Sequence, residues 1–339
     1  MTKPARSKVF QRNSGLEGLL AELNGVLGPA EEAITDLPDD PPYPTIVVIG
    51  APRSGTTLLM QWLAASGHFA YPSNLLSRFY KAPYLGARIQ QLIGDPRFNY
   101  KDELGDMAAY GLPYTSDVGK TKGALQPNEF WYFWRRFIPN ADPDWITPEQ
   151  EALIDGAGFR RGIAHIQHAF DRPFATKGII LQYNLEALRR ALGKVIFVHT
   201  RRHPFHNIQS LLQARQNYHG DVNTWFSVKP REFEWLQHRD PVTQVAGQVH
   251  FTQVGIEAEL AAMDPKYSIS IDHGDFCSDP RAFHATLRRK LALWGYDLPE
   301  AYSGPERFDV HDKVRVDDTL RDAILKAYAE LSGTMLGLP

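Results

Sequence analysis

The sequence predicts an α/β fold in which a central parallel sheet is covered by helices on both faces. Three short apolar, β-branched runs have the character of buried parallel strands, and each is followed by a turn and a helical pattern. These runs are residues 45–49, 194–199 and 267–271. Such alternation is typical of an open three-layer α/β domain, in which ligands bind outside the carboxyl ends of the strands.

An N-terminal helical arm and linker are expected before the sheet, over residues 1–44. Five leucines recur at helical spacing before Gly28-Pro29 and predict one amphipathic helix that ends there. The acidic, proline-rich run 36–44 then disfavours helix and central strand. The main domain is therefore expected over 45–339.

A segment of more than 140 residues separates the first two predicted strands and carries helical and aromatic patterns. We expect a mainly helical insertion, at about 75–170, that lies over the sheet. Its aromatic cluster at 130–134 suits the hydrophobic core, and it equally suits a surface that binds a ligand with an apolar body. No internal repeat or interior linker divides the main domain.

The composition excludes several classes of protein. The 339 residues include 39 acidic and 37 basic side chains, so the chain lacks the broad basic field of a nucleic-acid binder. No stretch approaches the roughly 18 to 20 apolar residues of a transmembrane helix, and the first residues lack the apolar core of a signal peptide. The single cysteine cannot form an intramolecular disulfide, so we expect a cytoplasmic protein.

The first predicted strand leads into a glycine-containing turn, GAPRSGTT at 50–57, and then into a helical pattern. The spacing is that of a Walker A phosphate loop (P-loop), with Thr56 where the lysine should stand. Backbone N–H groups and the helix N-terminus still suit an anion, but Arg53 is the only cation left in the loop. A ligand with one 5′-phosphate and one further anionic group therefore fits better than ATP.

A second polar pattern follows the second predicted strand. Arg202 lies at the strand end, Pro204 suits the first turn of the next helix, and Ser210 lies two turns into that helix. A guanidinium with a hydroxyl can clamp a second phosphate. Taken alone, this pattern also fits an ordinary solvated loop and a helix surface.

Together the two segments resemble the sulfotransferases that use 3′-phosphoadenosine 5′-phosphosulfate (PAPS). PRSGTTLL at 52–59 resembles the family's 5′-phosphosulfate loop, and Arg202 with Pro204 and Ser210 resembles its 3′-phosphate motif. The similarity follows the family's order over about 45–300. The segment after 267–271 is also similar, but His273 and Gly274 stand where Tyr and Glu are commoner. The resemblance implies a P-loop sulfotransferase fold.

The resemblance also implies a donor site. Arg53 would neutralise the bridging oxygen, and Lys177, which precedes Arg202 by 25 residues as a lysine does in the tyrosylprotein and carbohydrate branches, would stabilise the transferred sulfuryl group. The 5′-phosphate would be bound by backbone amides and threonine hydroxyls, and the 3′-phosphate by a guanidinium and a hydroxyl. The donor-binding residues besides Arg53 are then Ser54, Gly55, Thr56, Thr57, Arg202 and Ser210.

The general base is left open by the sequence. The tyrosylprotein branch has a glutamate about 21 residues after the loop arginine, but Asn74 stands there, and an amide cannot take a proton. Glu129 is the preferred catalytic base because burial among aromatic residues would raise its pKa; the alternative is a glutamate that only complements a helix N-terminus. His68, His165 and His168 are further possibilities. Two histidines three residues apart are a weak metal signal, so no metal is expected.

The expected function is sulfuryl transfer from PAPS to a hydroxyl of a small-molecule, lipid or carbohydrate acceptor, with adenosine 3′,5′-bisphosphate as the other product. One alternative is a P-loop nucleotide or small-molecule kinase, which the missing lysine at Thr56 and the Arg202–Ser210 pair disfavour. The other is a non-catalytic nucleotide-binding protein on the same fold. The acceptor's identity and the oligomeric state are left open.

Overall fold

The computed structural model describes residues 6–7, 10–11, 13–98, 100–101, 103, 114–116, 119–139, 143–310 and 312–337. At its centre is a four-stranded sheet in the order β2-β1-β3-β4, and every pair of neighbouring strands is parallel. The strands are β1 (Thr45–Ile49), β2 (Ala175–Lys177), β3 (Val195–Arg201) and β4 (Ser268–Asp272). The predicted α/β class and the three predicted strands are thus confirmed.

Strand β2 was not predicted. It has only three residues, without an apolar run, and it forms because β1 offers it a ladder. The Ile46 N–H donates to the Phe174 carbonyl at 2.8 Å, and the Gly178 N–H donates to the Val48 carbonyl at 2.9 Å. The pairing sets Lys177 beside Val48, so this lysine lies at the carboxyl edge of the sheet.

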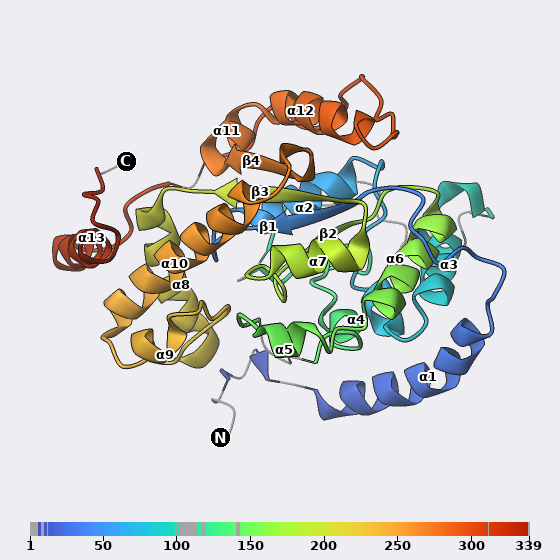
Figure 1. The fold of residues 1–339 in the computed structure, drawn as a ribbon, viewed down its shortest axis with the longest axis horizontal. Coiled ribbons are helices and arrows are strands. Elements are labelled where there is room, and N and C mark those ends of the chain that lie inside the picture. Colours follow the sequence, from blue (N-terminus) through green and yellow to red (C-terminus); the bar gives the residue numbers. More distant parts are fainter. Residues whose placement is uncertain are drawn as a thin grey trace.

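Helices cover both faces of the sheet, as Figure 1 shows. The helices are α1 (Ser14–Glu32), α2 (Thr56–Ala65), η2 (Leu76–Phe79), α3 (Pro83–Gly94), η3 (Pro96–Phe98), α4 (Trp131–Trp134), α5 (Pro148–Glu151), α6 (Gly156–Phe170), α7 (Leu185–Leu192), α8 (Pro204–His219), α9 (Phe233–Leu236), α10 (Pro241–Ala261), η4 (Pro265–Tyr267), α11 (His273–Ser278), α12 (Pro280–Ala292) and α13 (Asp318–Ser332). None in the described part of the chain is long and apolar enough to cross a membrane.

Two hydrophobic clusters flank the sheet because side chains alternate between the faces of a strand. Ile46 and Val48 of β1 join the cluster that contains side chains of α2 and α12. Val47 and Ile49 join the opposite cluster, with α6, α7 and part of α10. A third cluster packs α8, α10 and α13 together. The helices packed on both faces of the sheet hold its carboxyl edge in place.

The N-terminal helix α1 continues to Glu32, so the prediction that it ends at Gly28-Pro29 was wrong. A proline one turn from a helix end removes a single backbone hydrogen bond, and the remaining contacts of this turn compensate. The Glu31 carboxylate accepts the N–H groups of Tyr84 and Leu85, at 2.8 and 3.1 Å, in the first turn of α3. The arm therefore docks on the helices between β1 and β2, along one border of the molecule (Figure 1).

Candidate functional site

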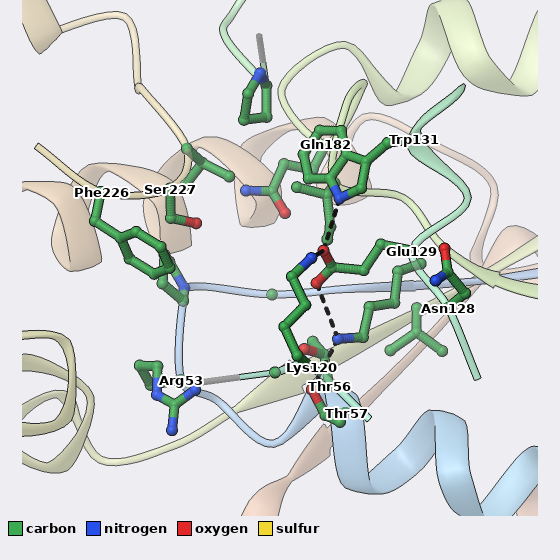
Figure 2. Close-up of a pocket in the computed structure, with 18 of the residues that line it drawn as sticks. Arg53, Thr56, Thr57, Lys120, Asn128, Glu129, Trp131, Gln182, Phe226 and Ser227 are labelled. Atoms are coloured by element: carbon green, nitrogen blue, oxygen red, sulfur yellow. Dashed lines mark hydrogen bonds and ion pairs between the residues drawn. The ribbon is translucent and has the colours of Figure 1, made fainter. Parts of the chain in front are cut away.

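A cavity of about 830 Å³ lies at the carboxyl ends of β1 and β2. One wall is the turn from Gly50 to Leu58, with Lys177 of β2 and Arg202 beyond β3. The other wall comes from α1, η2, α4 and the segment 218–233. Figure 2 shows the loop threonines and Trp131 on opposite sides of this space, with Glu129 and Lys120 between them.

The turn after β1 has the local geometry of an anion-binding loop. Helix α2 begins at Thr56, and the N–H groups of a first helical turn have no partner within the helix. Gly55 has φ 96°, and a Cβ there would clash with His273 Nδ1, so this position requires glycine. Arg53 has φ 70°, a strained value for a residue with a side chain.

The predicted loop residues face different ways. Gly55, Thr56 and Thr57 line the cavity. Ser54 is fully buried; its N–H donates to the Ala51 carbonyl at 3.2 Å, and its hydroxyl lies 2.8 Å from the Thr200 hydroxyl. The Ser54 side chain thus ties the loop to β3.

Lys177 points into the cavity although only 6% of it is exposed. Its ammonium donates to the Thr57 hydroxyl at 2.8 Å and lies 3.5 Å from Glu129 Oε1. Burial lowers the pKa of Lys177, and the neighbouring Glu129 carboxylate opposes that shift. The β2–β1 pairing thus places the Lys177 ammonium beside the turn that follows β1.

Glu129 lies between two lysines. Its Oε2 accepts the Trp131 indole N–H at 2.7 Å and the Lys120 ammonium at 3.2 Å, while Oε1 faces Lys177. Burial alone would raise the pKa of Glu129, but Lys120 and Lys177 outweigh burial and hold the pKa at about 2. The expectation of a raised pKa was therefore wrong: the sequence shows aromatic neighbours but not the two cations.

Lys120 and Trp131 line the candidate site, and sequence reasoning did not select them. Lys120 follows Gly119 outside any recognised motif, and it meets Glu129 only through the folding of the insertion. Trp131 was counted in the aromatic cluster, yet its indole N–H marks it as a polar partner. No spacing rule in the sequence pairs these side chains.

The two predicted arginines meet at the far end of the loop. Arg53 Nε donates to the Ser210 hydroxyl at 2.9 Å, and Arg202 Nη1 donates to the Arg53 carbonyl at 3.0 Å. Helix α8 begins at Pro204, as predicted, and its second turn places Ser210 against Arg53. Arg202 also forms an ion pair with Asp312, a residue that sequence reasoning did not select.

The other candidate bases lie away from the cavity. Its described lining includes none of His68, His165 and His168. His165 is buried in α6, 3.8 Å from Glu31 Oε1. Asn74 donates to the Thr121 hydroxyl and the Gly123 carbonyl and accepts from Asn128, so it fixes the segment that leads to Glu129. Among the described residues, no group of three His, Cys, Asp or Glu side chains could hold a metal ion.

His273 and Gly274 begin α11, directly after β4. The His273 ring packs against Gly55, which gives this histidine a structural place beside the loop. A Cβ at Gly274 would meet no atom within 4 Å.

The fold resembles that of a solved sulfotransferase. Sulfotransferase STF9 from Mycobacterium avium aligns with a TM-score of 0.53 at 12% identity, covering 97% of this chain and 87% of that one. Sulfotransferase STF1 from Mycobacterium tuberculosis H37Rv aligns at 14% identity with a TM-score of 0.48, covering 93% and 82%. No match was found among curated protein sequences. A model of the sulfotransferase family matches residues 44–294, well over half of the sequence, and the chain therefore belongs to the sulfotransferase family.

Proposed function

We propose that the protein transfers the sulfuryl group of PAPS to a hydroxyl of an organic acceptor and releases adenosine 3′,5′-bisphosphate. The observation that carries this proposal is the grouping of cations around a phosphate loop without the Walker lysine. Lys177 contacts Thr57 at one end of the loop, and the charge of Arg53 acts on Lys177, whereas Arg202 lies at the other end against the Arg53 carbonyl. Two separated groups of cations suit a donor with two separated anionic groups.

The donor would lie across the carboxyl edge of the sheet. The N–H groups at the start of α2 and the hydroxyls of Thr56 and Thr57 would bind the 5′-phosphate, helped by the helix dipole. Arg202 and Ser210 would bind the 3′-phosphate. Ser54 contributes by fixing the loop to β3, through its hydroxyl contact with Thr200. ATP, whose triphosphate needs a lysine at position 56, would bind less well.

The transfer step is an in-line displacement at sulfur. The acceptor oxygen forms a bond to sulfur while the bond from sulfur to the 5′-phosphate oxygen breaks, and negative charge grows on that leaving oxygen. Arg53 and Lys177 would stabilise this charge, and one well-placed donor of this kind contributes about 10²- to 10³-fold to the rate. The proton of the acceptor hydroxyl must pass to a base.

Glu129 is the proposed proton acceptor. It lines the cavity next to Lys177, and its low pKa keeps it ionised at neutral pH. A carboxylate with so low a pKa is a weak base, so its strength must come from position beside the attacking hydroxyl. The second candidate role, an ion-pair partner that keeps the buried Lys177 charged, follows from the same contact.

The acceptor would bind against the wall opposite the loop. Leu20, Trp131 and Tyr132 line this wall and suit an alcohol with an apolar or ring-bearing body. Helix α1 contributes Glu17 and Leu20 to the wall although the match to the family begins only at residue 44. The arm is thus the element best placed to give this chain an acceptor specificity of its own.

Calorimetry with adenosine 3′,5′-bisphosphate and with ATP tests the donor site. The bisphosphate is expected to bind more tightly, and Arg202→Gln is expected to remove most of that preference. Binding of ATP but not of the bisphosphate would contradict the proposal and favour a kinase.

Transfer of labelled sulfate from PAPS to a panel of apolar alcohols and sugars tests catalysis. No transfer to any member would favour a non-catalytic nucleotide binder. Activity on sugars alone would contradict the proposal of an apolar acceptor.

A further inference from the structure

Arg202, the proposed 3′-phosphate ligand, is already bound to a carboxylate of the same chain. Arg202 Nε donates to Asp312 Oδ1 at 2.8 Å, and Nη2 donates to the same oxygen. The remaining nitrogen, Nη1, donates to the Arg53 carbonyl. The edge of the guanidinium formed by Nε and Nη2, which would present two parallel N–H groups to a phosphate, is therefore occupied by Asp312.

The backbone that follows Asp312 is held by hydrogen bonds to α8. Asp312 lies between α12 and α13, in a stretch whose described residues form neither helix nor strand. Gln209 of α8 holds the chain just after it: Nε2 donates to the Lys313 carbonyl at 2.7 Å, and Oε1 accepts the Arg315 N–H at 3.0 Å. Gln209 is only 7% exposed and directly precedes Ser210. The same helix therefore places Ser210 against Arg53 and holds the segment that follows Asp312.

The pair is also shielded from solvent. The side chain of Arg202 is 12% exposed and that of Asp312 is 22% exposed, so water screens their charges only weakly. A 3′-phosphate bound to Arg202 would lie close to the Asp312 carboxylate on the same guanidinium, and both groups are negatively charged. The two anions cannot both occupy that edge without strong repulsion.

We propose that Asp312 competes with the 3′-phosphate for Arg202 and thereby sets the affinity and release of 3′-phosphorylated nucleotides. In the empty site Asp312 neutralises and orients Arg202. The 3′-phosphate displaces the carboxylate when the donor binds, and the return of the carboxylate speeds release of the bisphosphate product. A nucleotide without a 3′-phosphate leaves the pair intact. This inference rests on the proposed function, which places the 3′-phosphate on Arg202.

Calorimetry on the full chain with adenosine 3′,5′-bisphosphate and with adenosine 5′-monophosphate tests the inference. Asp312→Asn removes the competing charge and is expected to tighten bisphosphate binding by about tenfold, with the monophosphate changed less than twofold. Asp312→Glu keeps the charge and is expected to stay near the original affinity. Asp309→Asn, an exposed acidic position three residues earlier, is the matched control and is expected to change neither ligand.

Dissociation of the bisphosphate, followed by stopped flow, gives a second measurement. Asp312→Asn is expected to slow it by about the same tenfold. Weaker bisphosphate binding in Asp312→Asn would overturn the inference and make Asp312 a residue that positions Arg202; equal tightening of both nucleotides would also overturn it. If neither the original protein nor Asp312→Asn prefers the bisphosphate over the monophosphate, the proposed function itself fails, and the inference falls with it.

Discussion

The two walls of the cavity are built in different ways. The wall that carries the phosphate loop consists of strand ends and the turns that follow them, so β1, the loop and α2 form one continuous unit. The opposite wall consists of α1, η2, α4 and the segment 218–233, which are far apart in the sequence. Figure 1 shows α1 and α4 well away from the sheet, on the side of α6 and α7.

Under the proposed function, this contrast would separate the residues that act on the donor from those that select the acceptor. A strand–turn–helix unit fixes its backbone N–H groups locally, and the same unit serves any ligand with a phosphate. A wall assembled from separate helices changes shape whenever one helix moves. We therefore expect changes in the loop wall to alter donor binding and turnover, and changes in the opposite wall to alter the Michaelis constant for the acceptor.

The largest effect is expected for Lys177. Lys177→Met should lower kcat by about 10²- to 10³-fold, because the sulfuryl group loses a buried cation that acts in the transition state. The affinity for adenosine 3′,5′-bisphosphate should change far less, and Arg53→Ala should show the same imbalance. Steady-state kinetics and calorimetry measure the two quantities. Lys122→Met, an exposed lysine outside the cavity lining, is the control; equal losses of turnover and affinity would make Lys177 and Arg53 donor anchors instead.

Glu129 is expected to give the next largest effect and a distinctive pH dependence. Its pKa falls from 4.5 to about 2 on folding, so its contribution to stability is complete above the unfolded value and is lost as the pH falls through 4.5 toward 2. Glu129→Gln should therefore cost on the order of 3 kcal/mol of unfolding free energy at pH 7, and less at about pH 4. Urea unfolding at both pH values measures this, with the exposed Glu330→Gln as control.

The kinetics of Glu129→Gln separate its two possible roles. If Glu129 is the base, the kcat of the original protein shows no acidic limb between about pH 5 and pH 8, because Glu129 is ionised throughout that range. The Glu129→Gln variant then loses about 10²-fold or more in kcat. As an ion-pair partner, Glu129 acts through the pKa of Lys177, so the variant keeps activity at lower pH and loses it as the pH rises. Activity of Glu129→Gln that is kept at lower pH and lost as the pH rises would contradict a role of Glu129 as the base.

Substitution of Gly55 tests how tightly the loop packs against His273. Gly55→Ala is expected to destabilise the protein by about 1–3 kcal/mol, from the left-handed backbone and from contact with His273, and to weaken bisphosphate binding. Gly67→Ala is the matched control, because Gly67 has φ 72° but no atom within 4 Å of its added Cβ. His273→Ala should recover part of the loss in the Gly55→Ala background. Equal costs at the two glycines would mean that the His273 contact has no effect.

The sequence predicted the loop wall well because its signals are local. The strand, glycine turn and helix around Gly55 follow one another, and Pro204 begins α8 two residues after Arg202. Strand β2 was missed because three residues carry no periodicity, and its Lys177 was found only through the family's spacing. The charged residues, the turn residues and the hydrophobic pattern thus predicted most of the sheet and of its carboxyl edge.

Other contacts of the site could not be predicted because they form only when separate segments of the chain fold together. Nothing local indicates that Lys120 and Lys177 flank Glu129 and reverse the expected direction of its pKa shift. Asp312 lies 110 residues after Arg202, and no motif links the two. The end of α1 was misplaced for a related reason, since the contacts of Glu31 with α3 support the turn that follows Pro29.

The smallest effect is expected where the arm meets the insertion. The Tyr132 hydroxyl of α4 donates to Glu17 Oε1 of α1 at 2.6 Å, and both side chains line the cavity. Tyr132→Phe removes this bond at a cost of about 0.5–1.5 kcal/mol and should raise the Michaelis constant for the acceptor by about two- to fivefold while bisphosphate affinity stays unchanged. Tyr80→Phe makes the same chemical change at a neighbouring ring outside the cavity lining. A loss of donor affinity in Tyr132→Phe, absent in Tyr80→Phe, would show that the two walls do not act separately.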